Sequence, residues 1–119
     1  MSRPLSGYPD SFGSHRASIF PVTGPASYTQ YTAPSTGGQD VQISGPSGVK
    51  SVEWAQGSVS LAGTYRAEVV QVEASTLNGV SVANTRIVLK WYVVSTGAEV
   101  AGAVDLSGQT VNILVIGPK

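Results

Sequence analysis

The chain has 119 residues, with seven basic and seven acidic side chains, one histidine and no cysteine, so its formal net charge at pH 7 is zero. Charged residues make up 12% of the sequence, about half of the fraction usual in soluble domains, which favours a protein that works against another surface. The charge balance excludes a basic nucleic-acid-binding face, and the lack of thiols excludes disulfides and thiolate metal sites.

The first 48 residues are predicted to form an extended arm. Six of the seven prolines lie between Pro4 and Pro46, and proline supplies no backbone donor for a central strand. No apolar run has the length of a signal peptide or of a membrane span, so no membrane partner is expected. The arm nevertheless carries large apolar side chains, and those proposed as anchors for a partner are Ile19, Phe20, Tyr28 and Tyr31. Two alternatives remain open: the arm wraps its own domain as edge strands, or it docks on another subunit.

Residues 49–119 are predicted to form a β-domain, because Val, Ile, Thr and Tyr runs alternate with turns that contain glycine. No window has the apolar spacing of a helix. The expected fold is therefore all-β, a small antiparallel β-sandwich or a partly open barrel preceded by the arm. Strands are expected near Val41–Ser44, Val49–Ala55, Ser58–Leu61, Thr64–Ala74, Val80–Ser95, Ala98–Val104 and Thr110–Ile116.

Asn78-Gly79 predicts a two-residue hairpin turn between the two longest strands. Strict pairing from this turn would place Val70 opposite Ile87, Val72 opposite Thr85, Val69 opposite Val88 and Tyr65 opposite Tyr92. It would also put Arg66 and Glu68 on the apolar face. A bulge at Val69-Val70 would return Tyr65 and Ala67 to that face instead. Without a bulge, Arg66 is expected along Trp91 and Glu68 near Lys90.

Two strands are apolar on both faces, and together they carry more apolar surface than one small core can bury. In Thr110–Ile116 almost every residue is aliphatic, and Val88, Tyr92 and Val94 lie opposite the core face of their strand. These three residues are predicted to form a subunit interface, and the chain is predicted to be a dimer or trimer. Such a short domain is marginally stable alone, which favours burial against a partner.

No catalytic, cofactor or metal site is predicted, and the chain is not expected to be an enzyme. His15 lies in the arm, where a base is poorly held against a nucleophile, and the carboxylates are scattered along the sequence. The segments 36–38 and 45–48 are read as turns, because they lack the lysine and helix of a phosphate loop. Trp91 is expected in the core, whereas Trp54 is equally consistent with packing and with stacking on a sugar.

The cysteine-free β-domain of low charge, the arm of Pro, Gly and aromatic residues, and the ending Asp105-Leu-Ser-Gly-Gln-Thr-Val-Asn-Ile-Leu-Val-Ile-Gly117 together resemble small virion proteins of tailed bacteriophages. The resemblance is to capsid decoration, or cement, proteins in particular, and it is one of architecture over the whole chain. It implies a structural protein made in the host cytoplasm and located on the outer capsid surface of the virion. There it would clamp neighbouring subunits of the major capsid protein. Alternatives are a neck, tail or fibre component, or a carbohydrate-binding or adhesin-type module.

Overall fold

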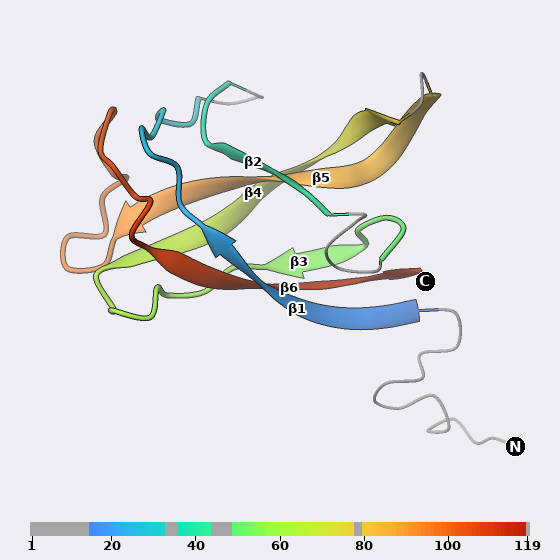
Figure 1. The fold of residues 1–119 in the computed structure, drawn as a ribbon, viewed down its shortest axis with the longest axis horizontal. Coiled ribbons are helices and arrows are strands. Elements are labelled where there is room, and N and C mark those ends of the chain that lie inside the picture. The colour runs from blue at the N-terminus through green and yellow to red at the C-terminus, as the bar shows by residue number, and fades with distance from the viewer. Residues whose placement is uncertain (1–14, 33–35, 44–48, 78–79, 119) are drawn as a thin grey trace, which may run out of the picture.

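The computed structural model describes residues 15–32, 36–43, 49–77 and 80–118. Within these residues the fold is all-β, with two antiparallel sheets of three strands packed face to face (Figure 1). The strands are β1 (His15–Thr23), β2 (Gln39–Gln42), β3 (Trp54–Gln56), β4 (Tyr65–Leu77), β5 (Val80–Val93) and β6 (Thr110–Pro118). Sheet 1 has the order β1-β6-β3 and sheet 2 the order β2-β5-β4. The predicted small antiparallel β-sandwich is therefore confirmed.

β1 lies inside the segment that was predicted to be an arm. It pairs with β6 over nine residues, from His15 opposite Pro118 to Thr23 opposite Thr110. β2 likewise comes from this segment and pairs with β5. The predicted boundary at residue 48 therefore does not separate an arm from a domain in the described residues, and residues 1–14 lie outside them. Pro21 is tolerated because β1 is an edge strand, where a missing N–H group need not cost a ladder bond.

The predicted hairpin is present, with Leu77 directly opposite Val80. The turn residues Asn78 and Gly79 lie outside the described residues. The register shifts between Val69 and Gln71, as the predicted bulge requires. As a result Ala67 is buried in the core and Arg66 lies on the opposite face, beside Tyr92.

A second register shift, which was not predicted, lies between Glu73 and Ser75. In the facing strand Asn84 has a positive φ of 57°, a conformation that asparagine adopts more readily than most residues. The four predicted cross-strand pairs are therefore wrong. The observed pairs are Tyr65 with Val93, Val69 with Leu89, Gln71 with Val88, and Val72 with Ile87.

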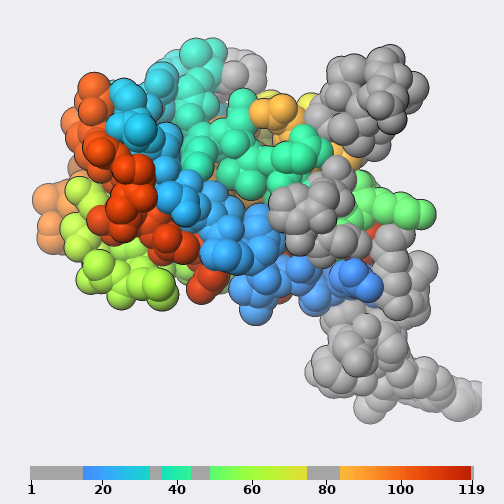
Figure 2. Space-filling view, viewed as in Figure 1, coloured from blue at the N-terminus to red at the C-terminus, as the bar shows by residue number. Residues whose placement is uncertain are grey.

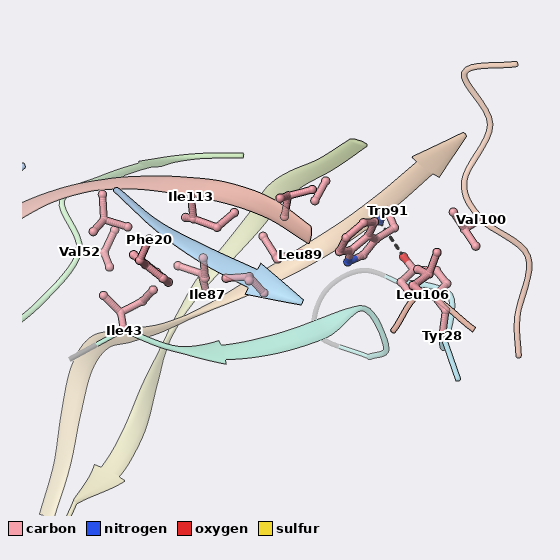
Figure 3. Close-up of a cluster of buried hydrophobic side chains, with 14 of the residues drawn as sticks. Phe20, Tyr28, Ile43, Val52, Ile87, Leu89, Trp91, Val100, Leu106 and Ile113 are labelled. Atoms are coloured by element: carbon pink, nitrogen blue, oxygen red, sulfur yellow. Dashed lines mark hydrogen bonds between the residues drawn. The ribbon is translucent and has the colours of Figure 1, made fainter. Parts of the chain in front are cut away.

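The core lies between the two sheets. Phe20 from β1 and alternate residues of β6 face Ile87, Leu89 and Trp91 from β5 (Figure 3). The alternation arises because successive side chains of a strand point to opposite faces. The other buried apolar residues come from strands and connections: Val22, Tyr28, Ile43, Val49, Val52, Ala67, Val100, Leu106, Val111, Ile113 and Val115. Trp91 is a core residue, as expected.

The segment after β3 crosses from sheet 1 to sheet 2. β3 pairs with β6, but the N–H of Ala67 in β4 donates to the carbonyl oxygen of Ser58 at 3.0 Å, and that of Ser60 donates to Tyr65 at 2.7 Å. A Cβ atom at Gly57 would overlap the carbonyl oxygen of Ala67, so the close approach requires glycine there. One side of the sandwich is thus closed by backbone pairing.

Three predicted strands are only partly formed or absent. The range 58–61 has one isolated bridge, between Val59 and Arg66, and no strand. In the range 49–55 only the last two residues belong to a strand, and the N–H of Val52 donates to Asn84 at 2.7 Å. The range 98–104 follows the end of β5 through a hydrogen bond from the N–H of Val100 to Trp91 at 2.9 Å and one isolated bridge. The range 49–55 bonds to both β5 and β6, because Lys50 and Glu53 donate to Pro118 and Ile116, and the range 98–104 bonds to both β5 and Tyr28.

Candidate interaction surface

The four predicted arm anchors have different environments. Phe20 and Tyr28 are buried in the core of their own chain. Tyr31 is half-buried, and its hydroxyl donates to Oε1 of Gln71 on β4 at 2.9 Å. Only Ile19 projects fully into solvent, with 69% of its surface exposed. In the described residues, the segment therefore wraps its own domain, and Ile19 is the anchor candidate that a partner can reach.

The predicted interface around Val88 is not an exposed apolar face. Val88 is 3% exposed, because the turn that contains Gly38 covers it. Tyr92 is half-buried beneath the guanidinium group of Arg66, which lies 4.1 Å from the centre of the ring. Val94, in the turn after β5, is 44% exposed. These three residues do not form one surface, because Gly38 lies against Val88 and Tyr31 reaches Gln71 on sheet 2.

The exposed apolar surface is instead on the outer face of sheet 1. In β6 every second residue from Val111 to Gly117 is buried, so Leu114 and Ile116 point outward. Ile116 lies between Ala17 of β1 and Trp54 of β3, and Leu114 lies between Ile19 and Gln56. We call Ala17, Ile19, Trp54, Leu114 and Ile116 the apolar face. Trp54 is 47% exposed, so its indole is available for contact.

A shallow hollow of about 190 Å³ lies at one end of the apolar face. Ile19 and Leu114 form its apolar walls, and Gln56 and Asn112 supply amide groups. The outward positions of β1, β3 and β6 between these residues carry no charged side chain. A hydrogen bond between Nε2 of His15 and Oε1 of Glu53, 2.9 Å long, marks the other end. The arrangement suits an apolar partner that also accepts or donates a few hydrogen bonds.

The outer face of sheet 2 has the opposite character. Arg66 lies over Tyr92 and pairs with Glu68 at 3.1 Å, and Nζ of Lys90 lies 5.3 Å from the centre of the Tyr92 ring. We call this surface the charged face; its members are Asp40, Arg66, Glu68, Gln71, Glu73, Arg86, Lys90 and Tyr92. Its side chains bind one another, which reduces the number of groups left to bind a partner.

A small ionic cluster lies on the charged face near β2. Nη2 of Arg86 is 3.2 Å from Asp40, and its Nε is 3.7 Å from Glu73. Partial burial raises the pKa of Glu73, and so do the hydrogen bond and the charge of Asp40, while Arg86 lowers it. The negative charge of Asp40 makes the Glu73 carboxyl harder to ionise, and the guanidinium group of Arg86 opposes this effect. The cluster stabilises the contact between β2, β4 and β5.

Tyr28 joins the loop 24–32 to the end of sheet 2. Its hydroxyl donates to Glu99 at 2.8 Å and accepts the backbone N–H of Trp91 at 3.1 Å (Figure 3). Glu99 also accepts the backbone N–H of Tyr31 at 2.7 Å. Burial, the largest cause, raises the pKa of the Tyr28 hydroxyl, and the bond to Glu99 adds to the shift. This network holds the segment that covers Val88.

A groove of about 320 Å³ lies where β3 crosses to β4, lined by residues 55–59 and 66–69. Its polar groups include Gln56, Ser58, Arg66 and Glu68. Glu73, the other carboxylate close to Glu68 in sequence, lies beyond the bulge and is not among the lining residues. The described residues contain no group of three His, Asp or Glu side chains placed to hold a metal ion.

Sequence reasoning did not identify the apolar face as a unit. The signal was available in Thr110–Ile116, whose alternate residues are apolar on both sides. The strands on either side of Thr110–Ile116 cannot be named from the sequence, because its composition places residues 15–23 in the arm and residues 54–55 in a longer strand. The described residues include no helix of the length and apolarity needed to cross a bilayer. No protein-family model, curated protein or solved structure matches the chain.

Proposed function

We propose that the protein is a non-enzymatic structural component that binds a protein lattice through the apolar face. The most specific form of this proposal is decoration of the capsid of a tailed bacteriophage, as the resemblance of the sequence implies. The observation that carries it is the apolar face itself: aliphatic side chains and a half-exposed tryptophan on one face of a sheet, without a charge among them. Exposed apolar patches with polar rims mark sites of protein interaction.

The chemistry of the apolar face favours a protein partner. A nucleic acid would require basic side chains to neutralise phosphates, and none lies among Ala17, Ile19, Trp54, Leu114 and Ile116. An aliphatic surface gains most by packing against another apolar surface of complementary shape. On a lattice that repeats the same site many times, modest affinity per copy suffices for high occupancy when copies also contact one another.

The test is binding to capsids purified without the protein. Trp54→Ser and Leu114→Ser remove apolar surface from the centre of the face and should reduce occupancy about tenfold or more. Leu61→Ser is the matched control, because Leu61 is 84% exposed but lies in the turn before β4, away from the apolar face. Equal occupancy for all three variants and the wild type would rule out the apolar face as the binding site.

A carbohydrate-binding module is the second candidate, and exposed Trp54 favours it. Gln56 lies two residues along the same outer face and lines the groove beside Arg66 and Glu68. Because Trp91 is fully buried, quenching of tryptophan fluorescence by a glycan would report on Trp54. A flat titration over a glycan panel would remove this candidate, whereas quenching that is lost in Trp54→Phe would favour it over the lattice protein.

A further inference from the structure

β1 is an edge strand of sheet 1 and, within the described residues, pairs only with β6. The backbone groups of β6 show which residues of β1 point their own N–H and carbonyl groups away from the sheet. The N–H of Asn112 donates to Oγ of Ser58 at 2.9 Å, and the carbonyl oxygen of Ile116 accepts the N–H of Glu53 at 2.9 Å. The backbone N–H of Asn112 and the carbonyl oxygen of Ile116 therefore point toward β3. In an antiparallel ladder, the residues opposite them must direct their own backbone groups away from β6. These residues are Pro21 and Ala17, and Ile19 follows by alternation.

The backbone groups of Ala17 and Ile19 have no hydrogen-bond partner among the described residues. Farther along the same edge, the carbonyl oxygen of Thr23 accepts Nε2 of Gln39 at 2.8 Å, so the open stretch ends there. Figure 2 shows β1, in blue, on the surface of the molecule. The open stretch thus offers two N–H groups and two carbonyl oxygens in the geometry of a strand that lacks its neighbour.

This edge carries little of the usual protection against strand addition. Natural sheets protect their edges with charged side chains, bulges or proline. Residues 17–23 include no charged side chain, and Pro21 is the only proline among them. Ala17 and Ile19 also belong to the apolar face. A strand added at this edge would cover part of Ile19, the most exposed large side chain of that face.

We propose that β1 of a second copy of this chain occupies the edge, antiparallel, about a two-fold axis at Ser18. Ala17 of each protomer then lies opposite Ile19 of the partner subunit. The N–H and carbonyl groups of these two residues, four in each protomer, all form hydrogen bonds across the new strand pair. A register that set Ile19 opposite itself would put Pro21 opposite Ala17, and the Ala17 carbonyl oxygen would find no donor. Pro21 therefore excludes that register, whereas the register about Ser18 pairs all four open groups of Ala17 and Ile19 with one another.

A second copy suits this edge because the edge is self-complementary. An antiparallel pair about a two-fold axis presents the same strand to itself, and in this register no two charged residues of β1 lie opposite each other, since Arg16 faces Phe20. The two copies of sheet 1 join into one sheet with the order β3-β6-β1-β1-β6-β3. Their apolar faces become one continuous surface. This dimer does not depend on the proposed function, because it requires no particle.

The first experiment tests the register by disulfide cross-linking of the full chain in solution. The chain has no cysteine, so Ser18→Cys places a single thiol at the proposed axis. Directly opposed residues in a non-hydrogen-bonded antiparallel pair have Cα atoms about 4.5 Å apart, which a disulfide can bridge. Thr23→Cys is the control on the same strand, more exposed but remote from the axis. Rapid oxidation of Ser18→Cys to a covalent dimer, at least tenfold faster than that of Thr23→Cys, is expected.

The second experiment tests the backbone bonds by sedimentation velocity over a range of concentrations. Ile19→Pro deletes an N–H group that sheet 1 does not use, so far-UV circular dichroism should stay unchanged. The dimer loses two hydrogen bonds, and its dissociation constant should rise about tenfold or more. Ile19→Thr keeps both backbone groups and changes only the side chain, so it should affect the dimer less than Ile19→Pro does.

The outcomes distinguish the β1 edge dimer from a monomer and from oligomers that form through another surface. A protein that sediments as a monomer at all accessible concentrations overturns the proposal. So does a dimer or trimer that Ile19→Pro leaves intact, or a cross-link that forms faster at residue 23 than at residue 18. If Ile19→Pro does not fold, the comparison of cross-linking in Ser18→Cys and Thr23→Cys still tests the proposal. Loss of capsid binding in Trp54→Ser with an intact dimer would concern the proposed function alone.

Discussion

Sheet 1 and sheet 2 share one core but present different outer faces to solvent. On the charged face, cations lie against rings and carboxylates of the same face, as with Arg66 on Tyr92 and Arg86 on Asp40. On the apolar face, Ile19 and Trp54 have large exposed areas and no charged neighbour between them. The low charge of the whole chain is therefore unevenly distributed. The charged face is organised to stabilise its own fold, whereas the apolar face is free to contact something else.

The largest expected effect comes from the hydroxyl of Tyr28, which holds the segment over sheet 2. Tyr28→Phe removes a group that bonds both Glu99 and the N–H of Trp91. The free energy of unfolding should fall by about 1–3 kcal/mol, because a buried N–H group loses its acceptor. Tyr65→Phe is the control, and its effect should be within about 0.5 kcal/mol. Chemical denaturation measures both, and equal effects would mean that the network does not stabilise sheet 2.

A smaller effect distinguishes the two outer faces directly. Arg66→Ala removes the cation over Tyr92 and the pair with Glu68, so unfolding should become easier by about 0.5–1 kcal/mol. Ile19→Thr removes exposed apolar surface and should change the stability by less than about 0.5 kcal/mol. Both are measured by urea denaturation of dilute protein, so that association does not contribute. If Ile19→Thr were the more destabilising, the apolar face would be part of the fold.

The smallest effect is a pH dependence that involves the ionic cluster of the charged face. Because the pKa of Glu73 is raised in the folded state, its contribution to stability is present below its ordinary pKa and is lost as the pH rises through the raised value. Glu73→Gln cannot titrate, so its stability should fall less over that interval than the stability of the wild type. Thermal unfolding at a series of pH values measures the difference, and parallel curves would contradict the shift.

Local signals in the sequence predicted the hairpin and its first bulge. Asn78-Gly79 indicates the position of the turn, and the conflict of Arg66 and Glu68 with an apolar face makes a bulge at Val69-Val70 one of two alternatives, which the structure confirms. The second shift, at Asn84, could not be predicted in this way. There the backbone of β5 also accepts a hydrogen bond from Val52, which lies in a distant part of the sequence.

The assignment of β1 to an arm shows a limit of composition. Prolines and glycines argue against central strands, but Pro21 lies in an edge strand, where its missing donor costs nothing to the ladder. The prediction that Val88 lies on an exposed face failed for a related reason. Gly37 and Gly38 have φ values of 81° and 73°, and their turn places Gly38 against Val88 of β5. A sequence pattern shows which side chains share a face, but not which loop later covers it.

The pairing of β1 with β6 has a consequence for biosynthesis. Thr23 and Thr110 are neighbours in space but are separated by most of the chain. While the chain is made, β1 and β3 therefore leave the ribosome long before the strand that lies between them in the finished sheet. Contacts between such distant segments form slowly. In the crowded interval before β6 arrives, a β6 strand from a neighbouring nascent chain can take the vacant central position, so strand exchange competes with correct folding.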